Sequence, residues 1–143
     1  MSHGLSKSKY VQFCQCSKLL WLKTYKPEEA KPDPSLQARF QTGHEVGELA
    51  KGLLGDYVDA TTRTTDGMLD LTAMIQRTQE LLDAGEVNIC EAAFSYQHNY
   101  CAVDLLHKVD GGYEIYEVKS STDVKDDHIR DVAYQKYVLE CCG

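Results

Sequence analysis

The sequence lacks any apolar run that approaches the roughly 20 residues needed for a transmembrane helix. Its first stretch, MSHGLSKSKYVQF, also lacks the apolar segment of a secretory signal. These two absences argue against a membrane-bound or exported protein and predict a cytoplasmic one. The six cysteines are therefore expected to be reduced thiols rather than disulfides.

Basic residues are outnumbered by acidic ones. The chain has 15 Lys and Arg against 22 Asp and Glu, a formal net charge of −7. Such a balance excludes a protein that coats nucleic acid nonspecifically through its bulk charge. It leaves room for a local nucleic-acid groove, and a carboxylate cluster that binds divalent cations would itself add to the negative count.

Proline is also scarce. All three prolines lie in the segment KPEEAKPDPS, which predicts a loop over residues 26–35. The chain contains no internal repeat and no low-complexity segment. With 143 residues, 43% of them hydrophobic and 26% charged, it is expected to form one globular domain over residues 1–143.

Four stretches carry apolar residues at spacings near 3.6, the period of an α-helix. They cover residues 6–25, 35–54, 69–83 and 126–140. The first is expected as one broken helix or two short ones, with Ser6 as its N-cap. Gly55 and Gly85 are expected to end the second and third. Between these two, residues 56–67 predict either a short edge strand or a loop. The apolar stripe of the second helix consists of Val46, Leu49, Ala50 and Leu53.

After these helices the period of the pattern changes to two. Three extended segments follow at residues 87–96, 99–109 and 113–121, separated by Gln-His and by Asp-Gly-Gly. Asp-Gly between extended segments is a strong hairpin signal, so an antiparallel meander is predicted. With the helices, this predicts an α/β fold in which a central mixed sheet with an antiparallel meander is flanked by helices.

The predicted hairpins bring acidic residues together. Opposed residues of an antiparallel pair have numbers with a constant sum and point to the same face. A two-residue turn at Asp-Gly places Asp104 opposite Glu117, whereas a turn at Gly-Gly places it opposite Lys119. A two-residue loop at Gln-His, or a four-residue loop around it, places Glu91 opposite Asp104.

Three aligned carboxylates on adjacent strands would lie within about 10 Å and repel one another. A divalent cation converts that repulsion into coordination, because Mg²⁺ prefers a few carboxylates together with water. The alternative is an ordinary amphipathic sheet whose charged face is solvated.

The combination of Asp104 on one strand with Glu117-Val118-Lys119 after the next hairpin resembles the motif of the PD-(D/E)XK nuclease superfamily. Glu91 in CEAAF is similar to the acidic residue upstream of that motif. Further residues resemble the RecB-like branch of the superfamily, namely His44 in TGHEVGELA and Gln135 in AYQKY.

This resemblance covers roughly residues 5–140 and implies a restriction-endonuclease-like core. It also implies an activity: a Mg²⁺- or Mn²⁺-dependent nuclease that hydrolyses DNA phosphodiester bonds. The chain is similar to CRISPR-associated RecB-like exonucleases, so an exonuclease-like action is expected. Larger relatives continue where this chain stops, just past its last predicted helix, which suggests a truncated or naturally minimal domain.

The resemblance also assigns roles. The implied metal ligands are His44, Asp104, Glu117, the backbone carbonyl of Val118 and Glu91. Lys119 would orient or deprotonate the attacking water, with a pKa lowered by nearby metal ions, or stabilise the phosphorane. Gln135 and Tyr134 would touch the scissile phosphate or the active-site network; the alternative is a helix face that packs on the sheet. Glu48, one turn after His44, would be either an orienting partner of that imidazole or a solvated carboxylate.

The sequence departs from the RecB-like pattern at two places. Position 139 is Leu, whereas RecB-like domains usually have Tyr four residues after the glutamine. Some relatives bind an iron–sulfur cluster through one N-terminal and three C-terminal cysteines. The thiols available here for an iron–sulfur or zinc site are Cys14, Cys16, Cys141 and Cys142.

Alternatives to a nuclease therefore stay open. One is a non-catalytic nucleic-acid-binding module, and another is a cysteine-metal structural module of a larger DNA repair or defence assembly. Cys90 and Cys101 are expected to be buried as small apolar residues. A group of N-terminal lysines is either a contact to a nucleic-acid backbone or a solvated helix face. The group consists of Lys7, Lys9, Lys18 and Lys23.

Overall fold

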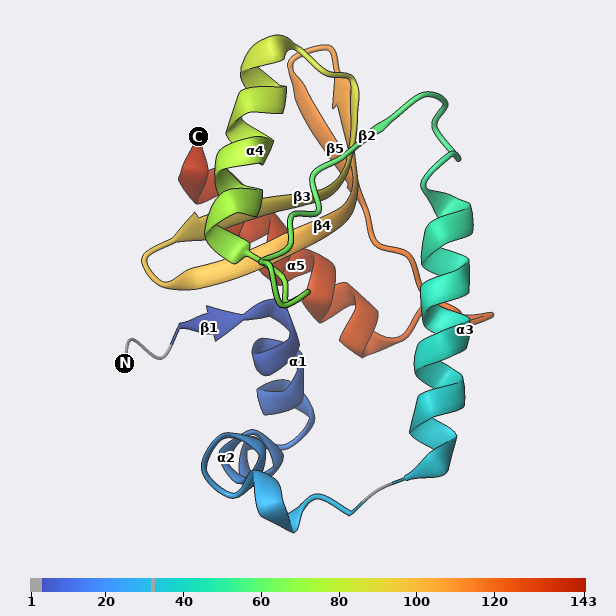
Figure 1. Cartoon of the computed structure of the whole chain (residues 1–143), viewed down its shortest axis with the longest axis vertical. Helices are drawn as coiled ribbons and strands as arrows, with labels where there is room; N and C mark the ends of the chain where they lie inside the picture. The colour runs from blue at the N-terminus through green and yellow to red at the C-terminus, as the bar shows by residue number, and fades with distance from the viewer. Residues whose placement is uncertain (1–3, 32) are drawn as a thin grey trace.

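The computed structural model describes residues 4–31 and 33–143. Within them, five strands form one mixed sheet, in agreement with the expected α/β class. The strands are β1 (Leu5–Ser6), β2 (Val58–Asp59), β3 (Asn88–Tyr96), β4 (Asn99–Val109) and β5 (Gly112–Tyr116). Figure 1 shows the long hairpin of β3 and β4 with the helices arranged around it.

The described helices follow the predicted segments closely. They are α1 (Lys7–Gln15), α2 (Ser17–Tyr25), the 3-10 helix η1 (Pro27–Glu29), α3 (Pro34–Ala50), α4 (Leu71–Ala84) and α5 (Asp126–Cys142). The first segment is two short helices, because Cys16 adopts an extended conformation between them. Ser6 caps α1 as expected, since its hydroxyl accepts a hydrogen bond from the Lys9 amide at 3.3 Å. Gly85 ends α4 with a φ of 81°, the left-handed conformation that favours glycine.

The long helix differs from the prediction in its end and in its packing. α3 ends at Ala50 rather than near residue 54, and turns fill the interval before Gly55. Two of the four residues of its predicted apolar stripe are solvent-exposed, Leu49 at 83% and Leu53 at 71%, and the other two are half-buried. In Figure 1, α3 stands apart from the sheet.

Both predicted two-residue turns of the meander are present. Tyr96 pairs with Asn99, and the residues between them both have positive φ, as a tight hairpin turn requires. Val109 pairs with Gly112 in the second hairpin, which selects the Asp-Gly turn over the Gly-Gly turn. In each hairpin the numbers of opposed residues keep a constant sum. Continuing these two registers places Asp104 across from Glu91 of β3 on one side and next to Glu117 on the other.

The third strand of the meander is shorter than predicted. Its pairing with β4 ends at Tyr116 rather than continuing to residue 121. At that point the Val118 amide donates to the side-chain Oδ2 of Asp104 at 2.8 Å. A side chain thus replaces the backbone as the acceptor, and the chain leaves the sheet at Glu117.

One edge of β4 is divided between two strands. β3 pairs along one edge of β4. On the other edge, β1 pairs in parallel with Asn99 and Tyr100, and β5 pairs antiparallel with residues 105–109. In the described part of the chain, no strand pairs with residues 101–104 on that second edge. We call residues 101–104 the open edge of β4.

Helices cover the sheet on both faces. α4 packs on β3, α5 packs across β3 and β4, and Figure 1 shows α4 in front of the sheet with α5 behind it. The buried cores are Ala60, Leu81, Ile89, Ala92, Val103 and Leu106 in one cluster and Cys101, Tyr134 and Val138 in another. Cys90 and Cys101 are each 1% exposed, which confirms their predicted burial. None of the helices in the described ranges has the length and apolar character to cross a membrane.

Thr78 connects α4 to β3 through hydrogen bonds, and replacing it should destabilise the protein. Its buried hydroxyl accepts from the Ala93 amide at 2.8 Å and donates to the Met74 carbonyl at 2.9 Å. Thr78→Val keeps the shape but leaves the Ala93 amide unpaired in the core, so we expect the free energy of unfolding to fall by about 1–3 kcal/mol. Urea denaturation measures this loss, with Thr72→Val on the exposed face of α4 as the control. Equal stability of the two variants would contradict this role.

Candidate active site

A cavity of about 250 Å³ lies between the C-terminal half of α3, the part of this helix nearest the sheet, and residues of β3, β4 and the segment after β5. It collects six residues that the sequence predicts for a site: His44, Glu91, Asp104, Glu117, Val118 and Lys119. They come from α3, β3, β4 and the segment after β5, so four separate elements position them. Gln135 lies behind this cavity and contacts it through Glu117, whereas Tyr134 lies elsewhere.

Glu117 is the centre of the polar network. Its side chain is only 5% exposed. Three donors surround its carboxylate: Lys7 Nζ at 2.9 Å, Gln135 Nε2 at 2.7 Å and Lys119 Nζ. These donors satisfy the hydrogen-bonding capacity of a nearly buried carboxylate.

Lys119 binds two carboxylates at once. Besides Glu117, its ammonium donates to Asp131 Oδ2 at 2.9 Å. Burial alone would lower the pKa of Lys119, but the hydrogen bonds to Asp131 and Glu117 outweigh burial and raise this pKa. The lowered pKa was expected beside bound metal ions, so it stays a prediction for the metal-bound site. A lysine that keeps its proton can orient water and stabilise negative charge, but it is a poor general base.

Lys7 was not predicted as a member of the site. Its ammonium donates to Glu117 and to the Ala102 carbonyl at 3.1 Å, and it lies 3.6 Å from Asp104 Oδ1. Burial lowers the pKa of Lys7, but the charges of Asp104 and Glu117 outweigh it and raise this pKa. The sequence shows only a lysine after a suitable N-cap, because the pairing of β1 with β4 that brings Lys7 here is long-range.

Glu91 carries an unusual backbone conformation. Its φ is 54°, a region that non-glycine residues seldom adopt, and it lies inside a strand. Burial and the charge of Asp104 raise the pKa of its carboxyl, against the opposing influence of Lys51 and Lys7. Backbone strain and a perturbed carboxyl at a cavity are features that accumulate at functional sites.

The α3 side of the cavity contains a second ion-pair group. His44 lines the cavity from α3. Glu48, a possible orienting partner of His44, instead accepts a hydrogen bond from Lys51 at 2.6 Å. Lys51 also donates to Asp59 at 2.7 Å, so it links the end of α3 to β2. Neither Lys51 nor Asp59 was among the residues predicted for the site.

The two neighbours on α5 have different surroundings. Gln135 is 1% exposed and its amide donates to both Glu117 and Asp131, the latter at 3.0 Å. It therefore belongs to the predicted network. Tyr134 donates its hydroxyl to the Leu5 carbonyl at 2.6 Å and stacks on Tyr10 at a centroid distance of 4.9 Å. This places Tyr134 in the packing of β1 and α1, in contrast to the predicted contact with substrate.

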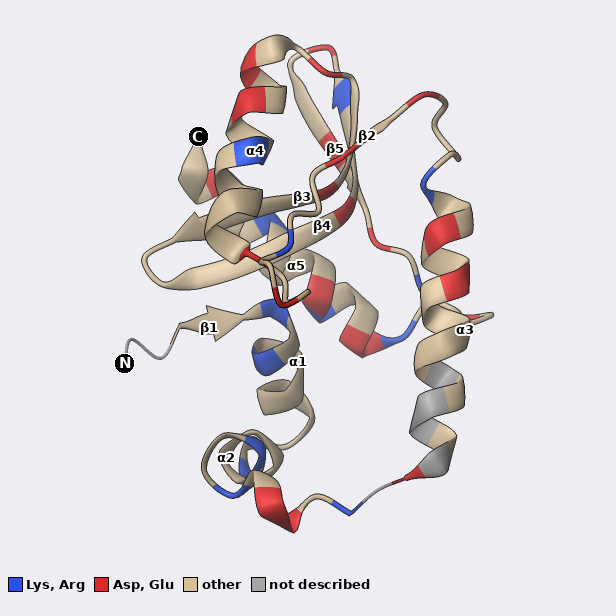
Figure 2. Cartoon of the chain, in the orientation of Figure 1, with Lys and Arg blue, Asp and Glu red and all other residues tan. Residues whose placement is uncertain are grey.

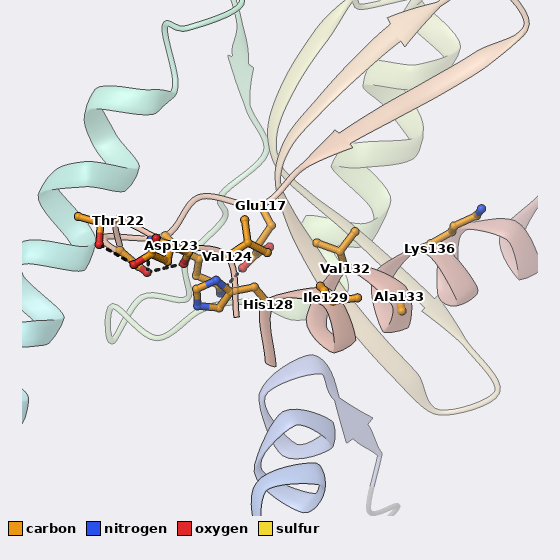
Figure 3. A pocket seen from close by; sticks show the side chains of 11 residues that line it. Glu117, Thr122, Asp123, Val124, His128, Ile129, Val132, Ala133 and Lys136 are labelled. Carbon is orange, nitrogen blue, oxygen red and sulfur yellow. Dashed lines mark hydrogen bonds and ion pairs between the residues drawn. The ribbon is translucent and has the colours of Figure 1, made fainter. Parts of the chain in front are cut away.

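A larger hollow of about 580 Å³ adjoins the first cavity and shares Glu117 and Lys119 with it. Figure 3 shows its remaining walls, which are the loop after β5 and one face of α5. They carry Ser121, Thr122, Asp123, Val124, His128, Ile129, Val132, Ala133 and Lys136. Glu117 and Lys119 thus lie at the boundary between two open spaces.

The donors at the first cavity suit a hard divalent cation in kind, because they are carboxylate oxygens and an imidazole. Their present arrangement is not that of a formed metal centre. Among residues 4–31 and 33–143, no three His, Cys, Asp or Glu side chains are grouped to hold an ion. Instead, ammonium groups neutralise Glu117.

The cysteines do not gather into the cluster that was considered from the sequence. Cys14 and Cys16 lie at the end of α1, where Gln15 bonds to Asp127 near the start of α5. Cys141 and Cys142 lie at the other end of α5, a helix of 17 residues and therefore about 25 Å long. A four-thiolate site on these residues is inconsistent with that separation.

The chain was compared with family models, with curated proteins and with solved structures. None of the three comparisons finds a match. The function must therefore be inferred from the residues and their geometry.

The thiols should differ sharply in reactivity. Burial raises the pKa of Cys90 to about 11 and that of Cys101 to about 12, so neither forms the reactive thiolate at neutral pH. Cys16 is exposed. We expect an alkylating reagent to modify Cys16 in the folded protein and to reach Cys90 and Cys101 only after unfolding, as mass spectrometry of digests would show. Modification of Cys101 as fast as Cys16 would contradict the described burial.

Proposed function

We propose that this chain is a divalent-metal-dependent nuclease that hydrolyses DNA phosphodiester bonds on a restriction-endonuclease-like core. One observation carries the proposal: a single cavity contains His44, Glu91, Asp104, Glu117 and Lys119, which lie far apart in the sequence. These are residues that the resemblance to the PD-(D/E)XK superfamily assigns to cleavage. In this proposal the chain acts in the cytoplasm.

The residues that would hold Mg²⁺ or Mn²⁺ are Asp104, Glu117, the Val118 carbonyl, His44 and Glu91. When bound, the ion would polarise a phosphoryl oxygen and offset charge on the leaving oxygen. Asp104 also accepts a hydrogen bond from the Val118 amide, which fixes this peptide beside the cavity. Gln135 holds Glu117 in place from behind.

Lys119 would act as a cation rather than as a base. Its ammonium lines both the small cavity and the larger hollow. From there it would orient the attacking water and stabilise the negative charge that develops on the phosphorane. Asp131 holds this ammonium in position.

The larger hollow is our proposed path for the DNA strand. Its walls carry the ammonium of Lys136 and the hydroxyls of Ser121 and Thr122, which donate to Asp123 in this structure. Phosphate oxygens accept hydrogen bonds from groups of these kinds. A strand lying in this hollow would reach Glu117 and Lys119.

The N-terminal helices support a nucleic-acid partner despite the acidic net charge. Residues 4–26 contain five lysines and no Asp or Glu, and Figure 2 shows the resulting blue segments on α1 and α2. Phe13, Trp21 and Tyr25 in this region are between 52% and 58% exposed. Aromatic rings among lysines bind single-stranded nucleic acid by stacking and by contact with phosphates. This favours the backbone-contact interpretation of the basic region.

A non-catalytic DNA-binding module is the second candidate. The observation in its favour is that Glu117 is already paired with Lys7, Lys119 and Gln135. The exposed apolar side chains of α3, among them Phe40 at 72%, support a place in a larger repair or defence assembly.

A cleavage assay separates the two candidates. We expect the wild-type protein with Mg²⁺ or Mn²⁺ to degrade end-labelled linear DNA, single- or double-stranded. Asp104→Ala and Lys119→Ala should each lower the rate by about 100-fold or more, because they remove a metal ligand and a charge-stabilising group. Covalently closed circular DNA should resist if the action is exonucleolytic.

Two control variants make this assay specific. Asp83→Ala and Lys108→Ala change an exposed Asp on α4 and an exposed Lys on β4, and both should cleave like wild type. Cleavage by all five proteins at one rate, or by none, would eliminate the catalytic proposal. DNA binding without cleavage would favour the second candidate.

A further inference from the structure

Lys7 enters the site through the open edge of β4. β1 ends at Ser6, which pairs with Tyr100 of β4, and Lys7 is the next residue and the first of α1. Its ammonium donates to the Ala102 carbonyl at 3.1 Å. A side chain therefore satisfies a backbone acceptor that a neighbouring strand would otherwise pair.

The same ammonium lies between two carboxylates proposed to bind the metal. It is 2.9 Å and 3.2 Å from the two oxygens of Glu117 and 3.6 Å from Asp104 Oδ1. A divalent cation shared by Asp104 and Glu117 would be attracted to the same oxygens. At such short distances two cations repel strongly, and more so where water is partly excluded. The Lys7 side chain is only 19% exposed.

Lys119 is held differently from Lys7. Lys119 has Asp131 as a second carboxylate partner, which would keep its charge compensated if a cation took Glu117. Within the described residues, Lys7 forms ion pairs only with Asp104 and Glu117. Of the two ammonium groups that contact Glu117, that of Lys7 would therefore be the one that a cation displaces.

We propose that Lys7 is a resident counter-ion of this site, and that a divalent cation binds by displacing its ammonium from Asp104 and Glu117. This inference rests on the proposed function, since it concerns the same cation site. Without the cation, Lys7 neutralises a nearly buried carboxylate. A divalent cation and the Lys7 ammonium compete for the same carboxylate oxygens, so Lys7 weakens the affinity of the site for the cation.

Calorimetric titration with Mn²⁺ tests this competition. The proteins are wild type, Lys7→Met, which removes the charge but keeps an extended side chain, and Lys9→Met as a matched control. Lys9 is on the same helix, but its ammonium donates to the Gly4 carbonyl at 3.2 Å, away from the carboxylates. We expect Lys7→Met to bind Mn²⁺ about tenfold more tightly than the other two proteins. Asp104→Asn in the Lys7→Met background should abolish this binding.

A second variant and a refolding measurement keep the test decisive if Lys7→Met does not fold. Lys7→Gln keeps a donor for the Ala102 carbonyl while it removes the charge, and it should also bind more tightly than wild type. If either Lys7 variant is unfolded in EDTA, we expect Mn²⁺ to refold it. Failure of Mn²⁺ to refold such a variant overturns the inference.

The outcome of the titration is separable from that of the proposed function. Equal or weaker Mn²⁺ binding by the Lys7 variants overturns the counter-ion role, and so does the absence of binding in every protein. Equal or weaker binding by the Lys7 variants leaves the proposed function untouched, because wild type still binds the cation. Absence of binding in every protein counts against a metal-dependent nuclease as well, and the assay with Asp104→Ala decides cleavage on its own.

Discussion

The pairing of the Glu117 carboxylate with Lys7 and Lys119 is the interaction on which the site depends. A carboxylate that is 5% exposed is strongly destabilising unless opposite charges and hydrogen-bond donors surround it. Here the donors come from three elements: the start of α1, the segment after β5, and α5 through Gln135. Because all three converge on one group, removing any of them affects the position of the others. The network thus links the start of α1 to α5, two helices that also pack on each other.

The divided edge of β4 explains why this network forms where it does. β1 and β5 each pair with one end of that edge, so the backbone between them needs polar partners from side chains. Lys7 supplies one such partner, and Asp104 uses its own carboxylate to capture the Val118 amide. At the open edge, charged side chains therefore contact backbone groups that a neighbouring strand would otherwise pair. In the proposed function, a cation and a phosphate would bind beside this edge.

The sequence predicted features that depend on neighbours along the chain. The two hairpin turns follow from short-range signals, and their register correctly brings Asp104 beside Glu91 and Glu117. Features that depend on distant segments were missed, since nothing local shows that Leu5–Ser6 pairs with β4 and thereby delivers Lys7. The early end of β5 was missed for a related reason: a carboxylate on another strand competes for the Val118 amide. Tyr134 was placed at the site because of its sequence neighbour Gln135, but helical geometry turns it toward β1.

The most direct test of this account is a double-mutant cycle between Lys7 and Glu117 without metal. The free energy of unfolding in urea and EDTA would be measured for wild type, Lys7→Met, Glu117→Gln and the double variant. If the buried ion pair holds the open edge together, the two changes should be coupled by about 1 kcal/mol or more. Additivity within about 0.3 kcal/mol would show that the two residues act independently and would contradict the account.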